Sequence, residues 1–326
     1  MSATVLIGTG ISASAFSNQF KGDLEIHEKA SRVGGRLCAR NYQEYIIQYG
    51  AQYATSSNSL FDDYLNRSGA TNLTSSIYIE ENNTYEDKNI WVHEEGMQFI
   101  TNYGFLNKKI NFNSEVMSIN QKSNSITLKD GKSVDYSKLI LSIPYPQALK
   151  LLGELDYECE FEPCLAIGLC LKQGSSFKPY AIRPNSKDIS WIASSKFFNK
   201  RIPESVLIHL SPERSKEMYY KNKETIINFA KEKIHNFTSS NLNIIYSDIF
   251  KWKYALTNKK MNQERYKALR LLADHIRTPS RDLSLNAIFN DVKDEDLKWV
   301  TEKIHYYLCQ QFLYLSFSYL ILQIME

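Results

Sequence analysis

The residues of this chain whose types and spacing suit ligand chemistry begin close to its first residue. Gly8 and Gly10 lie in a G-x-G-x-x-A turn directly after the apolar run at residues 4–7. Glycine lets the backbone turn with positive φ and approach a ligand closely, and a helix that starts after such a turn presents free N–H groups to phosphate. The positions that would face the phosphates are Gly8, Gly10, Ile11, Ser12 and Ala13. The pattern predicts a site for the diphosphate of a dinucleotide.

An acidic residue, Glu28, follows Gly8 by 20 positions and ends a segment, residues 24–28, in which apolar and polar residues alternate. The alternation predicts a second strand, and a carboxylate at this distance is placed to accept hydrogen bonds from a ribose. Its negative charge favours a ribose without a 2′-phosphate. The alternative interpretation is an ordinary strand–turn–helix unit with a glutamate on the surface.

A second pair of glycines, Gly34 and Gly35, precedes Arg36. Paired glycines allow the chain to pass close beside a cofactor, and the guanidinium of Arg36 offers a fork of donors to phosphate oxygens. The competing interpretation is a Gly-Gly surface turn with a solvated arginine. The distance of this segment from Glu28 favours the cofactor-binding interpretation.

The elements that must position these residues are predicted to be strands alternating with helices. Residues 4–7 are apolar without alternation, which is typical of a strand buried on both faces of a parallel sheet. Small residues at positions 12–15 would let the following helix pack close to that sheet. Residues 115–119 and 126–131 predict two further strands and an Asp-Gly turn. The predicted fold class is α/β.

The composition excludes several classes of protein. The 326 residues are 43% hydrophobic and 23% charged, so they can form a sizeable core. A net charge of +3, spread along the chain, indicates neither a nucleic-acid partner nor an anionic membrane surface. The five cysteines form no C-x-x-C pair, which argues against a metal site and a secreted disulfide framework. Because the start also lacks a basic leader, we expect a cytoplasmic protein that acts on a small-molecule substrate.

Several segments resemble a known family. Residues 28–36 match the E-K-x-x-x-x-G-G-R stretch of the flavin-containing amine oxidase group, with Glu28, Lys29, Gly35 and Arg36 at motif positions. Further segments resemble those of renalase-like FAD-dependent oxidoreductases, namely residues 49–55, 96–100, 136–148 and 252–255. One departure is Gln48, which stands where that family has an aspartate. The likeness covers about residues 3–256.

The resemblance implies FAD as the cofactor and a Rossmann-like FAD-binding domain with an inserted, sheet-based substrate domain. The FAD-binding domain would consist of residues 1–70 and 97–150, and the substrate domain of residues 71–96 and 151–256. In such proteins the position of Gln52 approaches the isoalloxazine ring, and the backbone at Val116 meets the adenine. The implied reaction is hydride transfer from a small amine or a dihydronicotinamide-type substrate to the flavin and then to oxygen. The sequence assigns no catalytic residue.

The tail, residues 257–326, departs from the family. All 13 glycines lie between Gly8 and Gly174, and the G-D motif with which the family closes the flavin site is missing from the tail. We expect a divergent, helical tail. Residues 308–324 form an uncharged run shorter than the about 20 residues of a membrane span, which suits a buried or partner-packing helix. A non-catalytic or degenerate dinucleotide-binding module is the alternative function, because the ring-side half of the flavin site would be missing.

Overall fold

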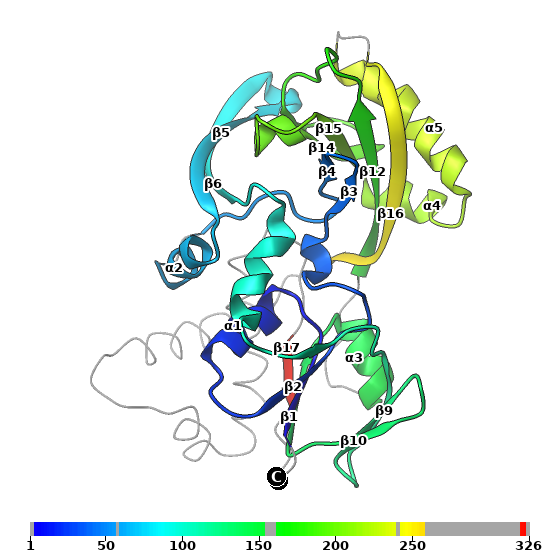
Figure 1. Cartoon of the computed structure of the whole chain (residues 1–326). Helices are drawn as coiled ribbons and strands as arrows, with labels where there is room; N and C mark the ends of the chain where they lie inside the picture. Colours follow the sequence, from blue (N-terminus) through cyan, green and yellow to red (C-terminus); the bar gives the residue numbers. More distant parts are fainter. Residues whose placement is uncertain (1–2, 57–58, 154–160, 239–241, 258–319, 324–326) are drawn as a thin grey trace.

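The computed structural model describes residues 3–56, 59–153, 161–238 and 242–257, together with the backbone of a strand at residues 320–323. Two large sheets dominate these residues. One is built around β1 (Thr4–Ile7), and the other, drawn above it in Figure 1, is crossed by β12 (Phe161–Leu171).

The first sheet has the predicted parallel core. Its strand order is β17-β11-β1-β2-β7, with β2 at Leu24–His27, β7 at Ile110–Asn111, β11 at Lys138–Ser142 and β17 at Leu320–Gln323. The four strands β11, β1, β2 and β7 run parallel to one another. The predicted α/β fold class is therefore confirmed.

One element differs from the expectation of a helical tail. Residues 320–323 form the strand β17, which pairs antiparallel with β11 in the register Ile140 opposite Leu322. A free edge of β11 offers a row of backbone donors and acceptors, and the apolar end of the chain satisfies that edge as a strand. The rest of the predicted tail helix lies outside the described residues.

The strand β1 is buried on both faces, as its unbroken apolar run predicts. Val5 and Ile7 pack on one face, and Leu6 packs on the other against helix α1 (Ile11–Gln19). The helix packs closely against the 3-10 helix η3 (Met97–Phe105). The contact is so close that a side chain at Gly104 would collide with the Ser14 backbone. Small residues thus bring the first helix into tight contact with η3 and with the core of the first sheet.

Smaller elements complete this part of the chain. A three-stranded antiparallel sheet contains β8 (Val116–Asn120), β9 (Ser125–Leu128) and β10 (Ser133–Asp135). The remaining elements are η1 (Gly35–Leu37), β3 (Arg40–Tyr42), β4 (Tyr45–Ile47), α2 (Ser59–Arg67) and α3 (Tyr145–Leu152). The two strands predicted near residues 115–119 and 126–131 are confirmed as β8 and β9.

The second sheet has seven strands in the order β16-β12-β15-β14-β13-β5-β6. Besides β12, its strands are β5 (Thr71–Ile79), β6 (Thr84–Val92), β13 (Ala181–Arg183), β14 (Ile189–Ser194), β15 (Ser205–Leu210) and β16 (Ile244–Thr257). Short 3-10 helices follow β5, at η2 (Glu80–Asn82), and β14, at η4 (Ser195–Phe197), and a third, η5 (His235–Phe237), precedes β16. The segments expected to form the substrate domain thus supply the strands of one sheet, while the exact domain boundaries stay a prediction.

The two faces of this sheet have different partners. Leu165, Ile167 and Ile208 point to one face and form a core with the helices α4 (Pro212–Met218) and α5 (Lys223–Ile234). The alternate residues of β12, such as Ala166, pack on the other face against the β3–β4 hairpin. Because side chains alternate along a strand, the second face remains for the hairpin and for a pocket beside it.

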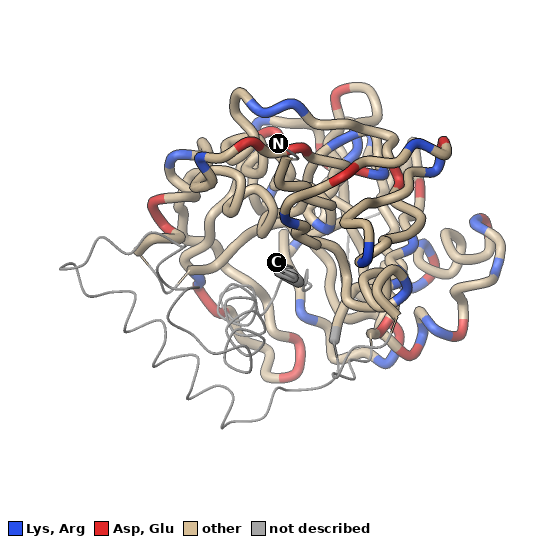
Figure 2. Tube along the Cα trace, turned by 90° about the horizontal axis from the view of Figure 1, so that it is seen from below, with Lys and Arg blue, Asp and Glu red and all other residues tan. Residues whose placement is uncertain are grey.

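Charged residues of both signs alternate along the trace in the view of Figure 2. In the part of the chain that the structure describes, no helix has the length and apolar character needed to cross a bilayer. The absence of a nucleic-acid partner, expected from the net charge, stays a prediction.

Candidate cofactor and substrate site

The first turn requires glycine at its first position. Gly8 has a φ of +98°, and its N–H donates a 2.9 Å hydrogen bond to the carbonyl of His27 on β2. A Cβ at this position would collide with the carbonyl oxygen of Ser142 on β11. The turn therefore lies between the carboxyl ends of β2 and β11, the two strands that flank β1, where open α/β sheets bind their ligands.

The N-terminus of α1 is free to bind an anion. Gly10 is the N-cap residue in an extended conformation, and it carries no side chain that could bond the first N–H groups. The first turn, which begins with Ile11, Ser12 and Ala13, contains no acidic residue. The N–H groups and the positive end of the helix dipole are thus directed at the position where the prediction places a diphosphate.

Glu28 is buried, with 8% of its surface exposed, and points back to the first turn. Its Oε2 accepts from the N–H of Thr9 at 3.0 Å and from the hydroxyl of Thr9 at 2.6 Å, while Oε1 accepts from the N–H of Ala30 at 2.8 Å. The alternative of a surface glutamate is therefore wrong. A carboxylate has about four acceptor positions, so these three donors leave room for a ribose hydroxyl.

The glycine pair lies directly against the first turn. Gly34 has a φ of +114°, and its N–H donates to the carbonyl of Thr9 at 3.0 Å. A Cβ on Gly35 would lie 3.4 Å from the Cα of Gly10. The two glycine segments, 25 residues apart, thus form one continuous surface, as expected for segments that approach the same cofactor.

Arg36 is buried at 8% exposure and connects the cofactor side to the second sheet. Its Nη1 donates to the carbonyls of Tyr254 at 3.1 Å and Ala255 at 3.4 Å, at the end of β16. The interpretation of this residue as a solvated surface arginine is wrong, because the side chain is enclosed. Its contact with phosphate stays a prediction.

Three other predicted site residues lie as follows. Val116 is buried at the start of β8, beside an irregularity in the β8–β9 pairing. Lys29 is exposed. Gln48 accepts from the N–H of Met97 at 2.8 Å through Oε1, a role that the family's aspartate can also fill. The adenine contact of Val116 and the cofactor role of Lys29 stay predictions.

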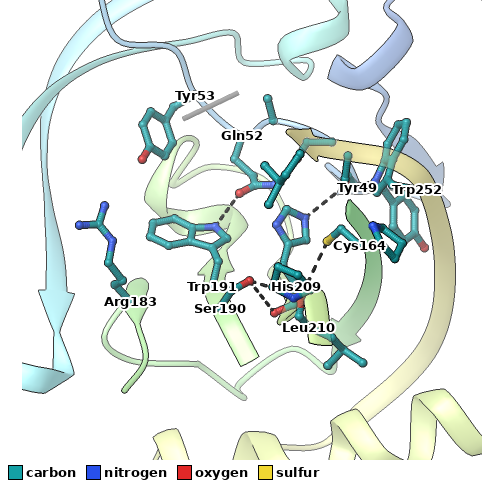
Figure 3. Close-up of a pocket in the computed structure, with 16 residues that line it drawn as sticks. Tyr49, Gln52, Tyr53, Cys164, Arg183, Ser190, Trp191, His209, Leu210 and Trp252 are labelled. Carbon is teal, nitrogen blue, oxygen red and sulfur yellow. Dashed lines mark hydrogen bonds between the residues drawn. The ribbon is translucent and has the colours of Figure 1, made fainter. Parts of the chain in front are cut away.

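A pocket of about 260 Å³ lies between the segment at residues 49–53 and the second sheet (Figure 3). The segment is fixed to the cofactor side, because Ala51 donates its N–H to the carbonyl of Arg36 at 3.1 Å. The pocket is lined by Tyr49, Gly50, Ala51, Gln52, Tyr53, Pro163, Cys164, Arg183, Ser190, Trp191, His209, Leu210, Pro212, Trp252, Ala255 and Leu256. It therefore adjoins the Gly-Gly-Arg loop through Ala51 and Ala255.

Gln52 lines this pocket and holds one of its walls. Its Oε1 accepts a 2.6 Å hydrogen bond from the indole nitrogen of Trp191. Its amide nitrogen donates to the carbonyls of Gln48, at 3.1 Å, and Gly50. Gln52 thus positions Trp191 across the pocket, and its predicted approach to a flavin ring is not tested by these contacts.

Sequence reasoning missed His209, which lies on β15 opposite Trp191 on β14. Its Nε2 lies 3.2 Å from the carbonyl of Tyr49, which also accepts a 2.9 Å hydrogen bond from the indole of Trp252. Burial lowers the pKa of His209 to about 4, so the ring is neutral at pH 7. No motif surrounds this histidine, and the cross-strand pairing that brings it to the pocket is invisible in a single sequence.

One cysteine, Cys164, lines the pocket as a buried thiol. Burial raises the pKa of Cys164 to about 12, and its Sγ lies 4.0 Å from the carbonyl of Leu210. Among the described residues, no group of three or more His, Cys, Asp or Glu side chains is arranged to hold a metal ion.

No family model matches the sequence, and no curated protein matches it either. Similar solved structures include reduced UDP-galactopyranose mutase, with a TM-score of 0.63, 11% identity and coverage of 83% of this chain and 85% of that one. Another is a putative protoporphyrinogen oxidase from Exiguobacterium sp. 255-15, with a TM-score of 0.63, 10% identity and coverage of 84% and 92%. A third is wild-type putrescine oxidase bound to putrescine, with a TM-score of 0.55, 9% identity and coverage of 76% and 84%. At these identities the likeness is one of fold, and the chain shares the mixed α/β fold of these three proteins.

Proposed function

We propose that this chain binds FAD and works as an oxidoreductase on a small-molecule substrate. The observation that carries the proposal is the meeting of three separate segments at the N-terminus of α1: the Gly8–Gly10 turn, the carboxylate of Glu28 and the Gly34–Gly35 pair. An uncapped helix start, a carboxylate with a free acceptor position and close-packed glycines are the features that a dinucleotide needs.

The first half of the cofactor would be held by residues near α1. The N–H groups of Ile11 and Ser12 would bind the diphosphate, and Glu28 would accept from the ribose hydroxyls. By resemblance, the backbone at Val116 would contact the adenine, and the guanidinium of Arg36 would donate hydrogen bonds to phosphate oxygens.

The ring half of the cofactor would lie near residues 49–53 and beside the pocket. A bound flavin supplies hydride acceptance and electron transfer to oxygen. The chain's own contribution is to orient the substrate and exclude water: Gln52 fixes Trp191, and the aromatic side chains of Tyr53 and Trp252 line the cavity. The proposed substrate is a small amine or a dihydronicotinamide-type molecule.

Within the fold, the sequence segments at residues 28–36, 49–55 and 136–148 favour a renalase-like member of the flavin-containing amine oxidase group. A cytoplasmic location is proposed with it. The thiols of Cys38, Cys164 and Cys170 are free, as a reducing compartment would keep them.

The alternative is a module that binds the ADP half of a dinucleotide without turnover. One feature of the sequence favours it: no glycine and no G-D motif, with which the resembled family closes the flavin site, follow Gly174. The residues that would hold the ADP half, at positions 8–36 and at Val116, all precede the tail in the sequence.

An absorption spectrum of the purified full chain tests the proposal. The enzyme is expected to show flavin bands at about 370 and 450 nm that bleach under a dihydronicotinamide or an amine and return in air. A colourless protein that binds ADP-ribose in a calorimetric titration would support the module instead. A colourless protein without affinity for FAD or ADP-ribose would overturn both.

A further inference from the structure

We propose that the pocket at residues 49–53 selects an uncharged, flat ring compound that donates a hydrogen bond from N–H or O–H to Nδ1 of His209. This deepens the proposed function, on which it rests, because the pocket adjoins the cofactor loop and is the place for the substrate. It names His209 as the residue that sets specificity, and it favours a ring substrate over an alkyl ammonium.

The walls of the pocket are flat and held in place. The indole of Trp191 is fixed by the bond of its nitrogen to Gln52, and its ring centroid lies 6.1 Å from that of Tyr53. Phe197 packs edge-on against both rings, at 5.8 and 6.3 Å. Across the cavity, Trp252 is fixed by its bond to the Tyr49 carbonyl. Fixed aromatic faces favour a planar ligand, because stacking adds to area burial and no wall has to be ordered on binding.

The size of the pocket limits the ligand. Pockets for drug-sized molecules measure about 300–1,000 Å³. The cavity here measures about 260 Å³. It therefore suits the reactive part of a substrate with one or two rings.

The tautomer of His209 is fixed by its neighbour. The carbonyl of Tyr49 can only accept, so Nε2 of the neutral ring must carry the proton and donate to it. The other nitrogen, Nδ1, then has a lone pair, and it forms no hydrogen bond with any residue that the structure describes. Figure 3 shows the imidazole between Trp191 and Cys164 in the wall of the pocket. Nδ1 is thus an acceptor without a protein donor, on a side chain that lines the cavity.

The other polar groups of the lining are either engaged or of the wrong kind for an ammonium. Gln52 uses both ends of its amide, and the hydroxyl of Ser190 is directed at the carbonyls of His209 and Leu210 at 3.3 and 3.4 Å. The described lining contains no carboxylate, and its one permanent charge is the guanidinium of Arg183, whose Nη1 lies 3.9 Å from Glu86. An ammonium would lose its hydration without gaining an opposite charge, which is unfavourable.

Calorimetric titration of the full chain, as purified, with three probes tests this inference. The probes are indole, which has a ring N–H, 1-methylindole, which has none, and benzylamine, which is an ammonium at pH 7. Indole is expected to bind about two- to tenfold more tightly than 1-methylindole, as one net hydrogen bond allows, and benzylamine to bind more weakly than indole. Equal affinities for the two indoles, or a preference for benzylamine, would overturn the proposal.

Variants assign the preference to one atom. In His209→Phe the preference for indole over 1-methylindole is expected to disappear, whereas His209→Gln, which keeps a donor for Tyr49 and an acceptor, should retain it. Ser190→Ala is the matched control from the same wall and should also retain it. If Ser190→Ala abolishes the preference and His209→Phe does not, the assignment to His209 is wrong. Should His209→Phe fail to fold, the affinities of the three probes for the unaltered chain still test whether the pocket prefers a ring with an N–H donor.

This titration needs no flavin signal. A protein that fails to show flavin bands but distinguishes the indoles would refute the proposed function and keep the pocket chemistry. A coloured, active protein that does not distinguish them would do the reverse.

Discussion

The hydroxyl of Thr9 and the carboxylate of Glu28 are joined by a 2.6 Å hydrogen bond, and the N–H of the same threonine donates to the same oxygen at 3.0 Å. The middle residue of the glycine turn therefore fixes the acid that would hold the ribose. The sequence alone indicates no role for Thr9, because the middle position of a G-x-G turn is variable in type. In the folded chain it links the end of β1 to the end of β2.

Replacement of Thr9 tests this link. Thr9→Val removes the hydroxyl but keeps the N–H and the shape, so Glu28 should lose part of its orientation. We expect ADP-ribose affinity to fall by about five- to tenfold, which corresponds to part of the about 1.5–3 kcal/mol of a hydrogen bond to a charged group, because the N–H of Thr9 still holds Glu28. Thr9→Ser, the control, keeps the donor and should bind nearly as well as the unaltered chain. Equal affinities of Thr9→Val and Thr9→Ser in calorimetry would show that the hydroxyl has no such role.

Gly8 is expected to be among the positions least tolerant of a side chain. Its φ of +98° disfavours other residues, and a methyl group would also collide with the Ser142 carbonyl. Gly8→Ala should lower the free energy of unfolding by about 3 kcal/mol or more, as strain and overpacking add. The control is Gly174→Ala, because Gly174 has a φ of +91° but nothing within 4 Å of its Cβ position. It should cost only about 1 kcal/mol in urea denaturation, and equal losses in the two variants would contradict the close packing at Gly8.

Arg36 should contribute to stability as well as to cofactor binding. Arg36→Met keeps most of the apolar volume but removes the donors to the carbonyls of Tyr254 and Ala255. Because those carbonyls are at the end of β16, we expect a loss of about 2–4 kcal/mol in the free energy of unfolding. Arg201→Met is the control, since Arg201 is exposed, and it should cost about 0.5 kcal/mol. If Arg36→Met left the free energy of unfolding unchanged, the hydrogen bonds of Arg36 to β16 would not be a structural link between the two sheets.

The neutral imidazole of His209 predicts a pH dependence of stability. Its pKa is lowered to about 4, against 6.5 for an ordinary histidine, because burial disfavours the charged form. Between these values the unfolded chain binds a proton that the folded chain does not. The contribution of His209 to the free energy of unfolding should therefore be fully present above about pH 6.5. It should fall by about 1–3 kcal/mol as the pH drops toward 4.

The difference between the unaltered chain and His209→Gln isolates this contribution. Burial also lowers the pKa of His27 and His93, but both proteins share these residues, and their effects cancel in the difference. Urea denaturation at several pH values from 7 to 4.5 provides the measurement. Parallel curves for the two proteins would mean that His209 is not the responsible group.

The nucleotide side of the molecule was largely determined by local sequence. An unbroken apolar run, a glycine turn and an acid at fixed spacing lie within the first 28 residues, and each depends on contacts between neighbours along the chain or on adjacent parallel strands. Strand period, helix start and glycine conformation are physical properties of short segments. That is why β1, α1, β2 and the buried position of Glu28 beside the turn follow from the order of the residues.

The pocket was decided by the tertiary structure. The residues that meet there are far apart in the chain: 160 positions separate His209 from Tyr49, and 139 separate Trp191 from Gln52. Arg36 finds its carbonyl partners 218 and 219 residues away. Such pairs depend on the register of a seven-stranded sheet and on which of its faces receives the β3–β4 hairpin. A single sequence carries neither, since a shift of one residue in register would turn His209 and Trp191 to the opposite face.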